Sequence, residues 1–135
     1  MKAIQIHEHG DASVLQCEEN VPIPSLGSEQ VLIKVVYSSV NYIDTYFRSG
    51  LYPVPSFPKI IGQDGCGYIE KIGDQVPIEC SLKIGDRVAF TFGSGSYAEY
   101  VTVNFTNVVK VPNEISLQNS VACMILSRIV KDTSH

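Results

Sequence analysis

The fold is decided by residues 30–40, which read QVLIKVVYSSV. Val and Ile are enriched in strands because their branched side chains pack well on a pleated, half-buried surface. The odd-numbered residues from Val31 to Val35 are apolar and alternate with an even-numbered set that includes Lys34. A period of two places the two sets on opposite faces of an extended chain. The stretch therefore predicts a long central strand.

Further strands are expected on both sides of this stretch. Each candidate is short, rich in Val, Ile, Tyr or Phe, and bounded by Gly, Pro or Asp, which favour turns. The candidates cover residues 2–8, 14–19, 65–72, 87–92, 97–103 and 108–111. Many short strands at near-regular spacing are typical of a barrel, so a mostly-β domain is expected.

Two segments break the strand pattern and predict helices. In residues 41–49, Ile43 and Phe47 recur at helical spacing, Asn41 could cap the first turn, and Gly50 could end the last. Three prolines between positions 53 and 58 exclude regular structure directly afterwards. Apolar residues at helical spacing in residues 116–131 predict a second helix at the C-terminal end.

Composition excludes several classes of protein. The chain has 135 residues, 44% of them hydrophobic, and a net charge of −4 without a Lys/Arg cluster, so a nucleic-acid partner is not expected. The longest apolar run, residues 121–126, is too short to cross a membrane, and no signal peptide is evident. The four cysteines are scattered without a CxxC pair, which predicts reduced thiols and a soluble, cytoplasmic protein.

Several motifs occur in an order that resembles a known family. The Gly-Asp-Arg-Val turn at residues 85–88, the strand YAEYV at 97–101 and the Val-Pro exit at 111–112 are similar to the GroES-like N-terminal domain of medium-chain dehydrogenase/reductases. The segments NYIDTYFRSGLY at 41–52 and IIGQDGCG at 60–67 resemble the zeta-crystallin-like quinone oxidoreductases. The resemblance runs from about Met1 to Ala122.

The resemblance implies a partly open, GroES-like β-barrel with short helices and a C-terminal helix. Residues 1–115 would form the catalytic, substrate-side domain. Residues 116–135 would begin the connecting helix and end in a divergent tail, with the nucleotide-binding domain absent. A full-length relative would use NADPH, and a homodimer is possible for that longer form.

Zinc chemistry is not expected. A catalytic zinc needs about three protein ligands of Cys, His or carboxylate type. By the resemblance, a zinc alcohol dehydrogenase would have a Cys near Asn41 and a His near Gln63, and this chain has neither. His7 and His9 could share a strand face, but no third ligand is evident, so a solvated strand end is the favoured interpretation. No metal site is predicted.

The residues implied for chemistry lie in segment 41–52. A quinone or conjugated enone already has an electrophilic carbon, so a neutral donor at its oxygen can suffice for hydride transfer. By resemblance, Tyr46 and Tyr52 would be catalytic, stacking on or hydrogen bonding to the substrate, and Asn41 would contact NADPH. Packing of the two tyrosines at the barrel mouth remains the alternative.

The glycines between positions 62 and 67 lead into a strand and not into a helix, so tight backbone packing is expected of them in place of phosphate binding. Cys66 among them is expected to be a buried, inert thiol. The expected function is that of the N-terminal catalytic domain of a zinc-independent NADPH:quinone (or enone) oxidoreductase. The alternative is a truncated, non-catalytic barrel that acts as a binding module.

Overall fold

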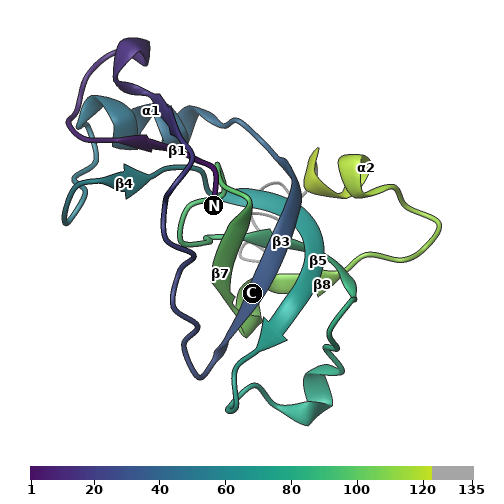
Figure 1. Cartoon of the computed structure of the whole chain (residues 1–135). Helices are drawn as coiled ribbons and strands as arrows, with labels where there is room; N and C mark the ends of the chain where they lie inside the picture. The colour runs from purple at the N-terminus through teal and green to yellow at the C-terminus, as the bar shows by residue number, and fades with distance from the viewer. Residues whose placement is uncertain (123–135) are drawn as a thin grey trace, which may run out of the picture.

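The larger of two sheets forms the body of the molecule. In a computed structural model, which describes residues 1–122, this sheet has five antiparallel strands in the order β7-β3-β5-β6-β8 and curls into a half-barrel (Figure 1). The strands are β3 (Gln30–Ser38), β5 (Asp64–Ile72), β6 (Arg87–Thr91), β7 (Tyr100–Asn104) and β8 (Val108–Lys110). The predicted central strand at residues 30–40 is confirmed, because β3 lies between β7 and β5.

A smaller sheet of three strands closes against the first. It has the order β2-β1-β4, with β2 (Gln16–Glu18), β1 (Ala3–Ile6) and β4 (Lys59–Ile60). Ala3 forms an isolated bridge with Ala98, and the Ile4 amide donates to the carbonyl of Tyr97 at 2.8 Å. These bonds join β1 to the chain that enters β7. The expected mostly-β, partly open barrel with short helices is therefore confirmed.

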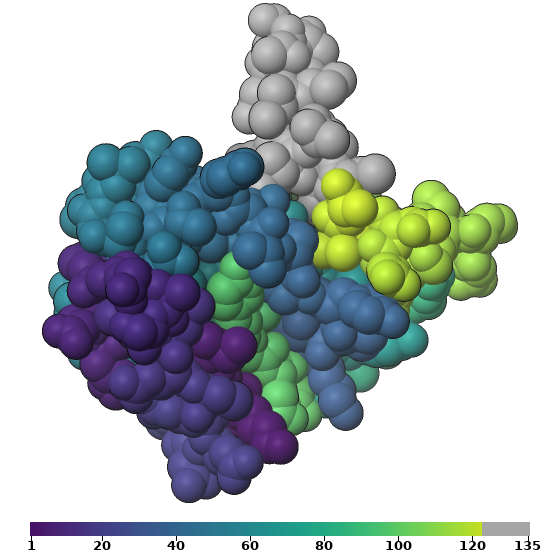
Figure 2. Space-filling model, turned by 90° about the horizontal axis from the view of Figure 1, so that it is seen from above, coloured from purple at the N-terminus to yellow at the C-terminus, as the bar shows by residue number. Residues whose placement is uncertain are grey.

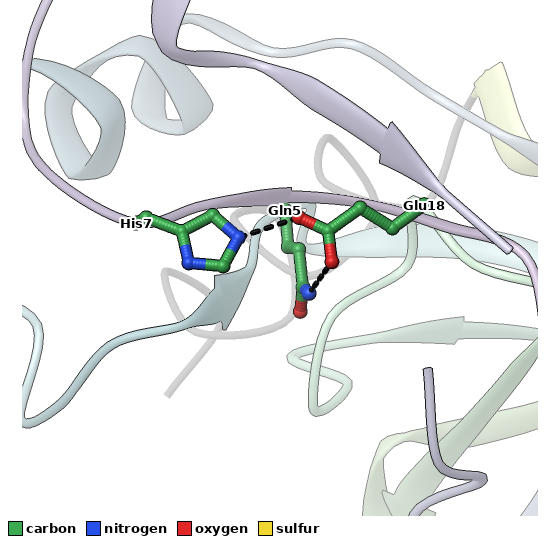
Figure 3. Close-up of polar contacts among 3 residues, drawn as sticks. All are labelled: Gln5, His7 and Glu18. Atoms are coloured by element: carbon green, nitrogen blue, oxygen red, sulfur yellow. Dashed lines mark hydrogen bonds and ion pairs between the residues drawn. The ribbon is translucent and has the colours of Figure 1, made fainter. Parts of the chain in front are cut away.

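Polar side chains fasten β1 to β2 (Figure 3). The His7 ring nitrogen Nε2 lies 2.5 Å from Oε1 of Glu18, and the Gln5 amide donates to Oε2 at 2.7 Å. The hydrogen bond from His7 is the main cause that lowers the pKa of Glu18. His9 has a different partner: its Nδ1 lies 3.0 Å from the carbonyl oxygen of Phe47. The two histidines thus have separate protein partners.

Helices are short and few in the described part of the chain. The helix α1 spans Tyr42–Ser49, with Asn41 as its N-cap and Gly50, at a left-handed φ of 93°, as its C-cap. This confirms the helix expected at residues 41–49. The second predicted helix is confirmed only for α2 (Leu117–Ala122), and its remainder to residue 131 lies outside the described residues. None of the helices within residues 1–122 has the length and apolar content needed to cross a membrane.

Some expected elements differ from those observed. The strand predicted for residues 14–19 is wrong at its start, because Ala12–Val14 forms the 3₁₀ helix η1 and only Gln16–Glu18 is extended. Three observed elements were not predicted: the strand β4 and the 3₁₀ helices η2 (Ile78–Cys80) and η3 (Phe105–Asn107).

The main core lies inside the curl of the large sheet. It is built from side chains with 0–2% exposure, which are Val31, Ile33, Ile69, Val88, Phe90, Val101 and Val103. The alternation predicted for β3 holds from Ile33 to Val36, with Lys34 exposed and Val35 half-buried, and it ends at Tyr37, which is exposed. Leu32 departs from it, since this residue is also buried. The pairing of β3 with β5 shifts register between Leu32 and Ile33, which interrupts the simple alternation of faces.

Candidate functional site

Close backbone contact between β3 and β5 builds the floor of the site. A Cβ atom added at Gly67 would lie 1.9 Å from the carbonyl oxygen of Lys34, and one added at Gly65 would lie 2.6 Å from that of Tyr37. Only glycine fits such an approach. The prediction of tight packing at these glycines is confirmed. The contact brings Asp64, the first residue of β5, beneath the segment that leads from β3 into α1.

Asn41 lies at the centre of a hydrogen-bonded cluster. Its side-chain nitrogen Nδ2 donates to Oδ1 of Asp64 at 2.5 Å and to Oγ of Ser39 at 3.1 Å. Its main-chain N–H donates to Oδ2 of Asp44 at 2.9 Å. Asp44 thus reaches back from the first turn of α1 to the residue that precedes the helix. Residues from three parts of the chain hold Asn41 in place.

Asp44 links this cluster to Tyr97, which lies in the chain that enters β7. Its side chain is 2% exposed, and Oδ2 also accepts a hydrogen bond from the hydroxyl of Tyr97 at 2.7 Å. The other oxygen, Oδ1, is buried and has no hydrogen-bond partner within residues 1–122. Burial, and then the hydrogen bond to Asp44, raise the pKa of the Tyr97 phenol well above its ordinary value. Tyr97 therefore stays protonated and acts as a donor.

Asp64 is a second buried carboxylate in the same cluster. It is 2% exposed, and burial raises the pKa of its carboxyl group. The hydrogen bonds from Ser39 and Asn41 oppose that rise because they stabilise the ionised form. The nearby charge of Asp44 raises it further. Two buried carboxylates thus lie in one cluster, and each needs its hydrogen-bond donors to offset the cost of burial.

The two tyrosines expected to be catalytic lie in contact with each other. Their rings meet edge to face with centroids 5.4 Å apart, and the Tyr52 amide donates to the carbonyl of Tyr46 at 3.1 Å. Phe47 packs on the same Tyr52 ring at 5.6 Å. Tyr52 remains 43% exposed, and within residues 1–122 neither phenol oxygen has a hydrogen-bond partner. This geometry is compatible with both the packing role and the catalytic role, because the two rings pack on each other while their hydroxyls have no protein partner within residues 1–122.

The hydrogen bonds of Asn41 within residues 1–122 do not reach this aromatic pair. It lies before the first turn of α1, Tyr46 lies more than one turn further on, and Tyr52 follows the helix. No hydrogen bond joins Asn41 to either tyrosine within the described residues. The structure therefore places Asn41 at the start of α1, Tyr46 within α1 and Tyr52 after it, with the two tyrosines in contact and Asn41 apart from them. Their assigned roles stay predictions.

Tyr97 also lines an open groove of about 410 Å³. Its mainly apolar walls come from β1, from the end of β3 and the residues just after it, and from the chain before β7, including Ile4, Val35, Val40 and Tyr97. Ser38 and Ser96 also line it, and their hydroxyls are 2.7 Å apart. Figure 2 shows the purple N-terminal segment, the blue atoms of β3 and the green atoms near β7 meeting on this face.

The cysteine and metal candidates can be placed as well. Cys66 is fully buried and its thiol donates to the carbonyl of Leu117 at 3.2 Å, while burial raises its pKa. The expected buried thiol is confirmed. Cys17, Cys66 and Cys80 are free thiols. In residues 1–122, no three His, Cys, Asp or Glu side chains gather closely enough to hold a metal ion.

Sequence reasoning missed part of the cluster. Asp44 was detectable in principle, because an acidic residue three positions after Asn41 is the spacing at which a side chain reaches back to a helix N-cap. Tyr97 gave no such signal, because it is separated from Asp44 by 53 positions in the chain. Its hydrogen bond to Asp44 forms only when the barrel closes.

Comparison with known proteins identifies the family. The model of the alcohol dehydrogenase GroES-like domain matches residues 27–113. Quinone oxidoreductase from Lama guanicoe is 41% identical over 124 residues and the one from Homo sapiens 38% over 125, each covering 90% of this chain. The chain spans 37% of the length of each of these relatives.

A solved structure agrees with this result. Quinone oxidoreductase from Escherichia coli, complexed with NADPH, superimposes with a TM-score of 0.82 at 32% identity, over 90% of this chain and 36% of that one. The enzyme from Pseudomonas syringae gives a TM-score of 0.84 at 36% identity, over 91% and 37%. The chain therefore belongs to the alcohol dehydrogenase GroES-like domain family, and it corresponds to the N-terminal part of quinone oxidoreductases in the medium-chain dehydrogenase/reductase superfamily.

Proposed function

We propose that residues 1–122 supply the substrate-side half of an NADPH-dependent reductase that acts on quinones or conjugated enones without zinc. One observation carries the proposal: 90% of the chain aligns with human quinone oxidoreductase at 38% identity, and 90% of it superimposes on a quinone oxidoreductase solved with NADPH. The chain spans just over a third of such relatives, so catalysis requires the rest of a longer protein.

The residues of this half fit one end of the cofactor. Asn41 offers an amide oxygen, and the ring pair of Tyr46 and Tyr52 offers an apolar, partly exposed face, both of which suit a nicotinamide and a flat substrate. The glycines at positions 62–67 do not fit a pyrophosphate, because they lead into β5 in place of a helix N-terminus. The phosphates and the adenosine belong to a domain outside residues 1–122.

In the proposed reaction, residues 1–122 supply only a hydrogen bond to the substrate. When bound, NADPH supplies the hydride that is added to the substrate. Negative charge then develops on the substrate's carbonyl oxygen, where a phenol that is protonated at neutral pH can donate a hydrogen bond. Tyr46 and Tyr52 are the phenols proposed for this donation, since both hydroxyls are free of protein partners within residues 1–122. Their edge-to-face contact fixes the rings relative to each other.

The test joins residues 1–122 to the unmatched part of the Escherichia coli enzyme and follows the loss of nicotinamide absorbance with p-benzoquinone. We expect turnover by the chimera, and a fall in kcat of about 10²–10³ in the Tyr46→Phe, Tyr52→Phe double variant, the range seen when an oxyanion donor is removed. Tyr68→Phe is the matched control, because Tyr68 is 41% exposed but lies on β5 away from the aromatic pair.

Two results would count against the proposal. A chimera that folds and binds NADPH but does not reduce the quinone would favour a non-catalytic barrel. A double variant with the turnover of the Tyr68→Phe control would remove both phenols from the mechanism. The 135-residue chain alone is assayed in parallel, and we expect no turnover from it.

A further inference from the structure

Asn41 is held by its nitrogen, which determines what its side chain can still bind. We propose that Asp64 is a positioning residue that fixes the Asn41 amide with Nδ2 turned toward the protein, so that Asn41 meets a ligand only through its carbonyl oxygen. The group it meets must then be a hydrogen-bond donor, such as the carboxamide N–H₂ of a nicotinamide ring. The ligand's identity rests on the proposed function, whereas the orientation of the amide does not.

The hydrogen bonds of the Asn41 amide support an orientation with Nδ2 turned toward the protein. An Asn side chain has two N–H donors on Nδ2 and two acceptor positions on Oδ1. Asp64 accepts one N–H at 2.5 Å and the Ser39 hydroxyl oxygen accepts the other at 3.1 Å. Both donors are then used. Turning the amide over would place its oxygen against the oxygen of Asp64 and lose the charge-assisted bond, which is among the stronger hydrogen bonds in proteins.

The position of Asp64 is itself fixed. Its carbonyl oxygen accepts hydrogen bonds from the Ser39 amide at 3.2 Å and from the Ser38 hydroxyl at 3.2 Å. The next residue, Gly65, lies against the carbonyl of Tyr37. The same stretch of chain therefore holds the main chain of Asp64 and carries Asn41. The acceptor cannot drift away from the amide without breaking these contacts.

Asp44 holds the other end of Asn41. Its Oδ2 accepts the main-chain N–H of Asn41 at 2.9 Å, and the Tyr97 hydroxyl binds the same oxygen. Main chain and side chain of Asn41 are thus bound by two carboxylates that are each 2% exposed. Buried carboxylates are costly unless they accept hydrogen bonds, so these bonds are expected to persist in solution. Asn41 enters any binding event already oriented.

The first experiment observes the Asn41 side-chain amide of the 135-residue chain by nitrogen-labelled NMR. We expect two well-separated Hδ2 resonances that exchange slowly with water. In Asp64→Ala the separation collapses and exchange accelerates, whereas in Ser39→Ala only one proton is released. Asp74→Ala, which removes an exposed aspartate outside the cluster, leaves the pair unchanged.

The orientation is refuted if the wild-type pair exchanges freely, or if it is unchanged in a folded Asp64→Ala variant. Should Asp64→Ala fail to fold, the Ser39→Ala spectrum decides, because loss of protection for neither proton would contradict the assignment of both donors. Asp64→Asn serves as a conservative variant that keeps an acceptor oxygen. We expect it to restore part of the separation.

The second experiment asks what the carbonyl oxygen meets. The chimera described above is supplied with NADPH or with its acetylpyridine analogue, in which a methyl ketone replaces the carboxamide and the ring substituent has no N–H. We expect NADPH to be preferred in kcat/KM by about 2- to 10-fold, the factor that one neutral hydrogen bond contributes. Asp64→Ala should lower this preference, because a freed amide can offer either a donor or an acceptor.

A preference that is as large in Asp64→Ala as in the wild-type chimera, or that is absent from the wild-type chimera, would refute the assignment of the carboxamide. General loss of structure would lower turnover with both cofactors and leave their ratio unchanged, so the ratio reports positioning. An inactive wild-type chimera would instead refute the proposed function and, with it, the ligand. The NMR result on the chain would still decide the orientation of Asn41.

Discussion

Removal of the Tyr97 hydroxyl tests whether the buried cluster stabilises the fold. The substitution Tyr97→Phe deletes the O–H that donates to Asp44 at 2.7 Å and changes little else. Asp44 is 2% exposed, its Oδ1 already has no partner within residues 1–122, and only the Asn41 amide would then remain on Oδ2. A hydrogen bond to a charged group contributes about 1.5–3 kcal/mol, so we expect a loss of about 2–3 kcal/mol in the free energy of unfolding.

A double-mutant cycle isolates the part that depends on charge. In Asp44→Asn the acceptor oxygen is kept but is neutral, and a neutral hydrogen bond contributes about 0.5–1.5 kcal/mol. Tyr97→Phe should therefore cost less in the Asp44→Asn background, which leaves a coupling energy of about 1–2 kcal/mol between the two positions. Tyr100→Phe is the matched control, since Tyr100 is a half-buried neighbour on β7.

The assay is urea unfolding of the 135-residue chain followed by circular dichroism. With a slope of about 2 kcal/mol per molar urea, a loss of 2 kcal/mol moves the midpoint by about 1 M. Tyr100→Phe should stay within about 0.5 kcal/mol of wild type. The reasoning is refuted if Tyr97→Phe unfolds at the midpoint of the Tyr100→Phe control, or if the costs of the two substitutions simply add.

Further predictions concern packing and pH. Gly67→Ala should cost at least about 3 kcal/mol, because its Cβ would lie 1.9 Å from the Lys34 carbonyl oxygen; Gly85→Ala should cost only about 1–2 kcal/mol, since Gly85 has a φ of 90° but nothing within 4 Å of an added Cβ. Equal urea midpoints for these two variants would contradict the steric argument. Phe90→Ala should cost about 3–5 kcal/mol, because it empties the centre of the main core; a smaller midpoint shift would place Phe90 outside it. Burial raises the folded-state pKa of Asp64 above 3.8, so its contribution to stability is full below that pH and declines as pH rises through the folded value. The urea midpoint of Asp64→Asn minus that of wild type should therefore grow with pH, and a constant difference would refute the shift.

The strands were largely predictable because most of them obey a simple period. β3, β5, β6 and β7 each lie within or close to the range that alternation and turn residues indicated. The start of the 14–19 prediction was wrong because Asp11 accepts a hydrogen bond from the Ser13 amide at 2.9 Å, which favours a turn over a strand. β4 has two residues and carries no period that a sequence can reveal.

The site was predictable where it is local. The capped helix places Tyr46, and the left-handed Gly50 turns the chain so that Tyr52 packs back on it. The partners of Asn41 and Asp44 come from β5 and from the chain before β7, separated from them by 23 and 53 positions. Such contacts depend on barrel closure, which no local pattern encodes.

The bonds between β1 and residues 97–99 also bear on the order of folding. The Lys2 main chain is joined to Glu99, which lies 97 positions further along the chain. Closing so long a loop is slow, because its entropy must be lost before the contact stabilises anything. During synthesis, β1 cannot form its hydrogen bonds to residues 97–99 until these residues have left the ribosome. Until then β1 is paired with β2 and β4 but the part of its edge at Lys2–Ile4 is open to other chains, and a chaperone that covers this part would protect the nascent protein from aggregation.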